Sequence, residues 1–198
     1  FKVYRMRKEK RKCAGYDCEE IYPKNEQKIK KSRGNDLIMK ILTVNSGSSS
    51  LKFKVFSMRT DSLLASGIVE RIGQCDTGSF LIYKNLPKNL SKKETINATT
   101  HSQALEYVLK LFEDPEYGCL EHIDDLIAVG HRVVHGKDVY NSSILITKES
   151  LEILKSFIEL APLHQPANIT GIEACMKILP DKPMVAVFDT AFHQTMPA

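Results

Sequence analysis

The sequence lacks tryptophan and long hydrophobic runs, and it is not rich in glycine or proline, with ten glycines and eight prolines in 198 residues. With 42% hydrophobic and 26% charged residues, the composition excludes collagen-like and low-complexity classes. The apolar stretch 183–188 is far shorter than the ~20 residues of a membrane-spanning helix. We therefore expect a soluble chain without a membrane partner, either one complete domain or a piece of a larger protein.

Cysteine is also sparse. The five residues, at positions 13, 18, 75, 119 and 175, form an odd set without the spacing of a disulfide framework. We expect free thiols in a reducing compartment and a cytoplasmic protein. Cys13 and Cys18 have no second Cys or His pair nearby, so half of a zinc site is the less favoured interpretation of them.

Basic residues outnumber acidic ones two to one at the start of the chain. Residues 1–38 hold 12 Lys and Arg against 6 acids, whereas the remaining 160 residues carry 16 basic and 18 acidic groups. The near-neutral body gives no argument for a nucleic-acid partner. We expect 1–38 to be a basic, disordered leader or upstream translated sequence before a true start at Met39, with an organelle-addressing extension as the alternative.

The chain from Met39 onward opens with a β-rich part. Period-two alternation and short polar connections predict an antiparallel meander with strands at 40–45, 50–57, 63–72 and 78–83. A polar loop is expected over 84–100. It is followed by a helix whose apolar residues at helical spacing are Leu105, Val108, Leu109 and Phe112.

Strands and helices alternate in the rest of the chain. The pattern predicts, in order, a buried strand at 125–129, a loop with Gly130 and Gly136, a strand at 142–146, a helix at 148–160 with Thr147 as its N-cap, a loop at 161–167, a helix at 168–179 and a strand at 183–188. Strands followed by such alternation are typical of a mixed α/β fold, one sheet with flanking helices.

Residues 45–52 (NSGSSSLK) lie between two predicted strands. Their glycine, serines and lysine bring backbone N–H groups, hydroxyls and a cation to one tight turn, as binding of a phosphate group requires. The segment lacks Walker spacing and leads into a strand, so a hairpin tip and not a helix N-terminus would hold the anion. A plain turn, with Lys52 facing water, is the alternative.

The segment 130–136 (GHRVVHG) places Arg132 after a buried strand, at the end where open α/β sheets present ligand sites. Arginine suits a carboxylate or a phosphate. His131 and His135 are four residues apart, but the two valines between them and the flanking glycines make a helical zinc pair improbable.

Two further segments carry candidate residues. The prolines of 161–167 (APLHQPA) would hold His164 in a rigid loop, where it could donate to developing negative charge or be merely structural. Asp189 follows an apolar strand, where a carboxylate ligates Mg²⁺, acts as a base or caps the next turn. A phosphate-binding turn, an arginine, a histidine and a metal-binding aspartate together indicate phosphoryl transfer.

The sequences of four segments, in this order, resemble those of the acetate kinase (acetate/propionate kinase) family: MKILTVNSGSSSLKFKVF, GHRVVHG, APLHQPANITGIEAC and VAVFDTAFHQTMP. The resemblance covers residues 39–198 and implies the amino-terminal domain of a two-domain enzyme of the sugar kinase/Hsc70/actin (ribonuclease H-like) superfamily, with the second domain absent. It implies a homodimer that uses Mg²⁺ and ATP to phosphorylate acetate reversibly to acetyl phosphate, releasing ADP.

Carried over by motif, the resemblance assigns each candidate a role. Ser48, Ser50 and Lys52 would bind phosphate, with Asn45 on the metal side. Arg132 would bind the carboxylate or the phosphoryl group, and Val134 and Leu163 would line a pocket for the acetate methyl group. His164 would donate to the phosphoryl group, and Asp189 would organise Mg²⁺.

Two positions depart from the family's pattern: Lys137 stands where a glycine is usual, and Gln165 where an asparagine is usual. Both residues lie beside site residues and not on them, so we expect them to affect the geometry of the loops more than the chemistry of the site. Two alternative functions stay open, a propionate or butyrate kinase of the same architecture, and a non-catalytic fragment, since the 198 residues contain about half of such an enzyme and no visible adenosine-binding sequence. The fragment by itself is expected to be inactive.

Overall fold

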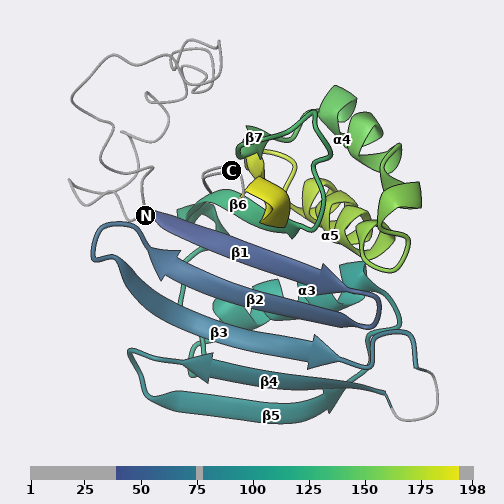
Figure 1. Ribbon diagram of the computed structural model, residues 1–198. Coiled ribbons are helices and arrows are strands. Elements are labelled where there is room, and N and C mark those ends of the chain that lie inside the picture. The colour runs from purple at the N-terminus through teal and green to yellow at the C-terminus, as the bar shows by residue number, and fades with distance from the viewer. Residues whose placement is uncertain (1–38, 75–77, 192–198) are drawn as a thin grey trace. The chain divides into compact units, whose positions relative to one another are not determined.

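One eight-stranded sheet runs through residues 39–74 and 78–191, the residues that the computed structural model describes (Figure 1). The strand order is β5-β4-β3-β2-β1-β6-β8-β7. The first four strands form the predicted antiparallel meander, and a fifth extends it: β1 (Lys40–Gly47), β2 (Ser50–Ser57), β3 (Ser62–Glu70), β4 (Ser79–Asn85) and then β5 (Leu90–Ile96). The predicted leader 1–38 and Cys75 lie outside the described residues.

The second half of the sheet is mostly parallel. β6 (Leu126–Val133) pairs in parallel with both β1 and β8 (Met184–Phe188), and the short β7 (Ile144–Leu145) pairs antiparallel with β8 at the edge. β1, β6 and β8 therefore point the same way, and their carboxyl ends lie at one edge of the sheet.

Three α-helices of the described chain follow the meander: α3 (His101–Phe112), α4 (Lys148–Lys155) and α5 (Gln165–Ile178), with 3₁₀ turns η2 (Ile123–Asp125) and η3 (Ile158–Leu160). Thr100 caps α3 by accepting from the Gln103 N–H at 3.2 Å, and Thr147 caps α4 as predicted, by accepting from Ser150 N–H at 3.2 Å. None of these helices is long and apolar enough to span a membrane.

The core lies between the sheet and the pair of helices α3 and α5, which contact each other (Figure 1). Period two in β1 and β2 sends Leu42, Val44 and Phe53 to this side, where each is at most 2% exposed. Phe53 meets Phe112 of α3 edge to face, with ring centroids 5.6 Å apart. Helix α3 is therefore held by the apolar face that its spacing predicted.

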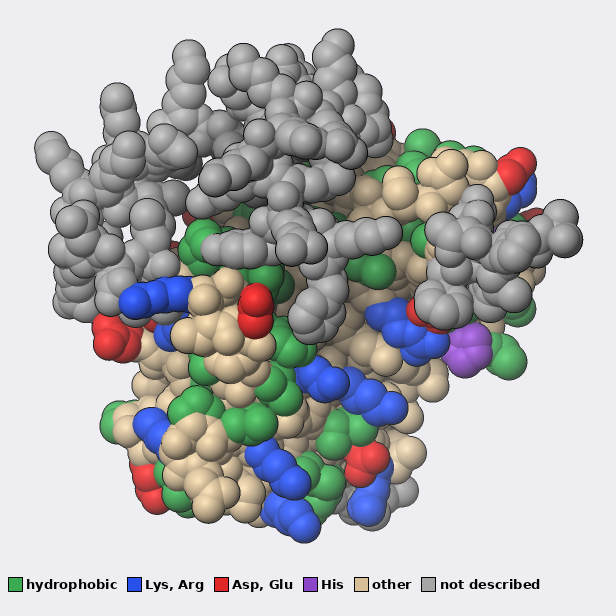
Figure 2. Space-filling view, turned by 60° about the vertical axis from the view of Figure 1, so that its left-hand side comes forward, with side chains coloured by type: hydrophobic (Ala, Val, Ile, Leu, Met, Phe, Trp, Pro, Cys, Tyr) green, Lys and Arg blue, Asp and Glu red, His purple; other side chains and the backbone are tan. Residues whose placement is uncertain are grey.

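The opposite face of the meander is charged. Lys52 and Lys54 of β2, Lys84 of β4 and Lys93 of β5 are exposed and alternate with the core positions. A space-filling view shows Lys and Arg side chains lying among hydrophobic ones on the surface of the described part (Figure 2).

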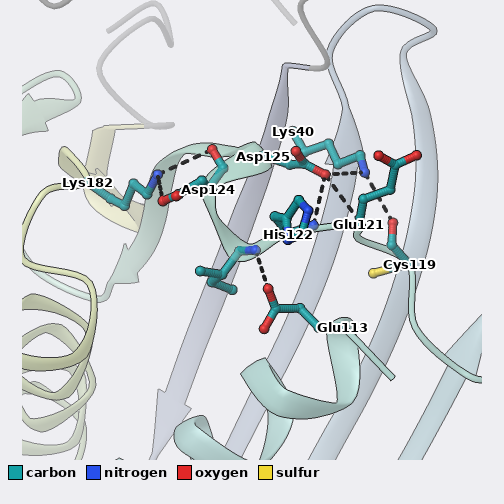
Figure 3. Close-up of polar contacts among 9 residues, drawn as sticks. Lys40, Glu113, Cys119, Glu121, His122, Asp124, Asp125 and Lys182 are labelled. Carbon is teal, nitrogen blue, oxygen red and sulfur yellow. Dashed lines mark hydrogen bonds and ion pairs between the residues drawn. The ribbon is translucent and has the colours of Figure 1, made fainter. Parts of the chain in front are cut away.

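A buried ion pair fixes the other end of the parallel strands (Figure 3). Lys40, at the start of β1, donates to the Asp125 carboxylate at 3.1 Å and to the Cys119 carbonyl at 3.3 Å. The two side chains of the pair are 9% and 19% exposed. Because Asp125 directly precedes β6, this pair ties the starts of the two central strands together.

Strand β5 corrects the predicted loop over 84–100. Its edge position explains the error: only Leu90 and Ile96 at its ends are apolar, while Lys93 faces solvent. On the inner side, Glu94 accepts from the Tyr107 hydroxyl at 2.6 Å. Polar contacts replace apolar burial here, so hydrophobic periodicity gave no signal.

The segments around β6, α4 and α5 hold the other corrections. The predicted loop after 129 begins only after Val133, because Gly130–Val133 pairs with β8, and Gly130 pairs with β1 as well. Helix α5 begins at Gln165, not 168, since Pro166 occupies its first turn, where no N–H donor is needed. The predicted strand 142–146 shrinks to β7, and the helix predicted over 148–160 ends at Lys155 before η3.

Candidate active site

Three of the candidate residues lie at the carboxyl ends of three parallel strands. Asn45 lies near the end of β1, Arg132 near the end of β6, and Asp189 directly after β8. The carboxyl edge of parallel strands is where open α/β sheets bind ligands. The structure therefore brings together residues that lie up to 144 positions apart in the sequence.

The β1–β2 hairpin presents the predicted phosphate-binding groups. Asn45 and Lys52 are directly opposed in the antiparallel register, so their side chains share one face of the sheet. Ser48 and Lys52 are exposed, while Asn45 and Ser50 are half-buried. The tip thus offers hydroxyls, an amide and an ammonium to an anion, and the phosphate-binding role of these residues stays a prediction.

Contacts from outside the hairpin hold its tip. His101, at the start of α3, donates from Nε2 to the Gly47 carbonyl at 2.7 Å and is only 8% exposed. The Ile72 N–H donates to the Ser49 carbonyl at 3.0 Å. An added Cβ at Gly47 would lie 2.8 Å from Ser50 Oγ, so a side chain at this position would require the Ser50 hydroxyl to rotate away. The His101 contact could not be predicted from local sequence pattern, because His101 is separated from Gly47 by 54 positions.

Arg132 and Asp189 meet directly. The Nε atom lies 3.0 Å from both carboxylate oxygens, and Nη2 lies 2.6 Å from Oδ2. This hydrogen bonding to Asp189 raises the pKa of Arg132 further above its ordinary value, so the group is a permanent cation. Both side chains remain close to half exposed, at 49% and 42%. None of the described residues accepts from Nη1, so the Nη1–Nη2 edge is open to a second anion.

Val134 and Leu163 do not close a pocket by themselves. Val134 is half-buried, but Leu163 is 80% exposed. Within the described residues, the two side chains therefore leave any methyl-binding pocket open on the Leu163 side. Their role as its lining stays a prediction.

His164 is the N-cap residue of α5, directly before the corrected start of the helix. Its ring is exposed and has no hydrogen-bond partner among the described residues. The imidazole is thus free to donate to a ligand, and that role stays a prediction. The rigid loop expected over 161–167 is helical from Gln165 onward.

The two departures from the family pattern are accommodated differently by the local structure. Lys137 adopts a φ of 53°, in the left-handed region that glycine prefers. Its ammonium lies 5.9 Å from the centre of the Phe157 ring, and its N–H donates to His135 Nδ1 at 2.7 Å. Gln165 is fully buried and donates to the Leu154 carbonyl at 3.3 Å, while its Oε1 has no partner in the described structure.

Asn168 of α5 was not among the predicted residues. It is 4% exposed and hydrogen bonds to the backbone of both β1 and the segment after β6. A signal was present in the sequence: Asn168 shares a three-to-four-residue spacing with Gly171, Ile172 and Cys175, so it is the polar member of an otherwise apolar helix face.

His131 belongs to the core and not to the site. It is 2% exposed, and burial lowers its pKa to about 4, so the ring is neutral. Across 39–74 and 78–191, no group of three or more His, Cys, Asp or Glu is placed to hold a metal ion. Cys119 and Cys175 are free thiols, as predicted, and burial raises the pKa of Cys175 to about 12.

The chemistry of the edge suits a magnesium ion that arrives with a nucleotide. Mg²⁺ prefers oxygen ligands and usually takes only one or two carboxylates, keeping waters and substrate phosphates as its other ligands. Asp189 offers a half-exposed carboxylate, and Asn45 offers an amide oxygen at the same edge. These residues fit Mg²⁺, and the neighbouring cations fit the phosphates.

Comparison with known proteins matches most of the chain. A sequence profile of the Acetokinase family matches residues 40–198. The acetate kinase of Desulfitobacterium hafniense (strain DSM 10664 / DCB-2) is 50% identical over 161 residues, which are 80% of this chain and 39% of that protein. This chain therefore spans well under half the length of its curated relatives.

Solved structures give the same result. The crystal structure of Porphyromonas gingivalis acetate kinase matches with a TM-score of 0.75 at 42% identity, over 80% of this chain and 39% of that chain. A propionate kinase from Francisella tularensis matches with a TM-score of 0.71 at 38% identity, over 81% and 39%. The predicted fold class, a mixed α/β sheet with flanking helices of the sugar kinase/Hsc70/actin superfamily, is confirmed.

Proposed function

Because this chain belongs to the Acetokinase family, we propose that the whole protein transfers the γ-phosphoryl group of ATP to acetate, reversibly, to give acetyl phosphate and ADP. The observation that carries this proposal is the Arg132–Asp189 pair. It combines a cation with an open edge and a carboxylate suited to Mg²⁺ at the edge of the sheet that also bears the Ser48–Lys52 hairpin tip.

Arg132 receives the anion that accepts the phosphoryl group. A guanidinium binds a carboxylate through two parallel N–H donors, and the Nη1–Nη2 edge of Arg132 provides such a pair beside Asp189. Ser48, Ser50 and Lys52 bind the phosphate side, and Asn45 would hold the metal ion through its amide oxygen. His164 donates to an equatorial oxygen of the phosphoryl group.

The reaction is one displacement. An acetate oxygen forms a bond to the γ-phosphorus as the bond to the β,γ-bridging oxygen breaks, and ADP leaves with that electron pair. Asp189 would hold the Mg²⁺ ion, which when bound would neutralise phosphate charge. Little covalent help is needed, so the cations and donors of this edge act by positioning the two anions and offsetting their repulsion.

A propionate kinase is the second candidate function. It is favoured by the structural match to the Francisella tularensis enzyme and by the 80% exposure of Leu163, which leaves the region next to Val134 open. One methylene in such a pocket changes binding by only ~1–3 kcal/mol, so both acids are expected to react at different rates.

We further propose that the whole protein is a cytoplasmic homodimer. The free thiols Cys119 and Cys175 support a reducing compartment.

A chimera tests this function. Residues 39–198 replace the matching part of the Desulfitobacterium hafniense acetate kinase, whose remainder supplies the rest of the chain. Acetyl phosphate formation from ATP is then measured with acetate and with propionate. We expect turnover with both acids and a preference for acetate. A folded chimera that phosphorylates neither acid would contradict the proposed function, and a preference for propionate would establish the second candidate.

A further inference from the structure

Asn168 connects the segments of the candidate site. Its Nδ2 donates to the Ser46 carbonyl at 2.9 Å, and its Oδ1 accepts from the Val134 N–H at 3.1 Å. Ser46 follows Asn45 and precedes the hairpin tip by two residues, while Val134 is two residues beyond Arg132. Asn168 itself lies one helical turn after His164. One buried side chain thus contacts two of the predicted segments and belongs to the helix that begins at the third.

The position of this amide explains why it is needed. The parallel pairing of β1 and β6 ends at Val44 and His131. Beyond that point, Asn168 bridges the Ser46 carbonyl of β1 and the Val134 N–H, which directly follows β6, and these two groups do not pair with each other. A carboxamide has the same donor and acceptor as a peptide group, so it continues the ladder across two strands that have parted.

Gly171 allows the helix to come this close. An added Cβ at Gly171 would lie 2.5 Å from Ser46 Cβ, which leaves no space for any side chain. The contact of α5 with β1 therefore depends on a glycine one turn after Asn168. Together, the glycine and the amide fix how far the start of α5 lies from the ends of β1 and β6.

We propose that Asn168 is a positioning residue for phosphoryl transfer, which sets the spacing between the β1–β2 hairpin, the Arg132–Val134 segment and His164. This inference rests on the function proposed above. Asn168 touches no reacting atom in this account. It acts through the two backbone groups that it holds, and displacement of either segment by about 1 Å is enough to slow such a reaction on the order of a hundredfold.

Asn85 provides a matched control. It is also a buried asparagine, 2% exposed, and it also holds backbone groups: its Nδ2 donates to the carbonyls of Tyr117 and Gly118 at 3.0 and 2.9 Å, and its Oδ1 accepts from Lys88 N–H at 3.0 Å. It ends β4, outside the candidate site. A merely structural asparagine at 168 would behave as Asn85 does.

The first measurement uses turnover of the chimera. Asn168→Ala and Asn85→Ala are both expected to lower the unfolding midpoint. At a temperature where both are folded, we expect Asn168→Ala to lower kcat for acetate by about tenfold to a hundredfold, and Asn85→Ala to leave it within about twofold. Equal kcat values for the two variants would overturn the positioning role while leaving the proposed function intact.

Asn168→Asp tests the positioning role if the alanine variant does not fold. The carboxylate is nearly isosteric and keeps an acceptor for Val134 N–H, but it has no donor for the Ser46 carbonyl. We expect kcat to fall in this variant as well, because the hairpin loses its tie to α5. Wild-type kcat in Asn168→Asp would overturn the proposal.

Amide exchange in the 198-residue chain gives a readout that needs no activity. The Val134 N–H is expected to exchange faster in Asn168→Ala and to stay protected in Asn168→Asp and Asn85→Ala. Equal protection in all three variants would overturn the bridge itself. Because this measurement stands even if the chimera is inactive, failure of the bridge and failure of the proposed function are distinguishable.

Discussion

Arg132 and Asp189 hold each other and still present atoms to a ligand. Their three close contacts use Nε and Nη2 of the guanidinium, and the close to half-exposed carboxylate remains accessible to a cation. Each group also orients the other before any substrate arrives. Positioning of this kind is what phosphoryl transfer requires from its protein.

Val134 is expected to set the size of the acid that is accepted. In the chimera, Val134→Ala removes two methyl groups and leaves the backbone N–H that Asn168 binds. We predict that the ratio of kcat/KM for propionate to that for acetate rises by about tenfold. Val139→Ala is the control, because Val139 lies in the same loop and is 53% exposed. An unchanged ratio in Val134→Ala would show that this side chain does not line the pocket.

The strands of the hairpin and the helix α3 followed from the sequence because burial there is periodic and apolar. Three of the motif segments followed from polar residues at strand ends, and the fourth, 161–167, followed from the two prolines around His164. Strand β5 did not, since its inner face is held by polar contacts such as that between Glu94 and Tyr107. His101 was also missed, because its partner, the Gly47 carbonyl, lies far away in the sequence, and local pattern carries no information on such a contact. Asn168 stands out in the sequence only as the polar member of an apolar helix face, and that spacing does not identify its partners, the Ser46 carbonyl and the Val134 N–H.

The Lys40–Asp125 pair is expected to matter more than its neighbour, Lys182–Asp124 (Figure 3). Lys40→Ala leaves the 19% exposed Asp125 carboxylate unpaired, which should lower the free energy of unfolding by about 3 kcal/mol. In the second pair Asp124 is 90% exposed, so Lys182→Ala should cost under ~1 kcal/mol. Urea unfolding of the 198-residue chain measures both, and equal losses would show that Lys40 does not stabilise the start of β1.

Close packing between β2, β3 and β4 leaves no room at Gly67. An added Cβ would lie 2.4 Å from Phe53 Cζ and 2.5 Å from the Ile82 carbonyl oxygen. We predict that Gly67→Ala lowers the free energy of unfolding by about 1–3 kcal/mol. Gly130→Ala, whose nearest atom would be 3.8 Å away, should have little effect. A stable Gly67→Ala would mean that the meander packs less tightly than described.

The described chain contains only part of the residues that the proposed reaction needs. It spans 39% of the Desulfitobacterium hafniense relative, and the groups proposed to bind anions lie along one edge of its sheet. We predict that the 198-residue chain by itself forms no detectable acetyl phosphate from ATP and acetate, because the nucleotide contacts are expected in a second domain. Robust formation by this chain alone would contradict the two-domain assignment.

The central claim is that Arg132 receives the anions of the reaction, and kcat/KM of the chimera for acetate tests it most directly. Arg132→Ala leaves negative charge unpaired where the phosphoryl group moves between acetate and ADP. We predict a fall of about a hundredfold or more, corresponding to on the order of 3–5 kcal/mol, and little recovery in Arg132→Lys, which lacks the paired donors. Arg59→Ala, in the turn at the far end of β2, should stay near the unmodified value. Near-normal kcat/KM in Arg132→Ala would contradict the account.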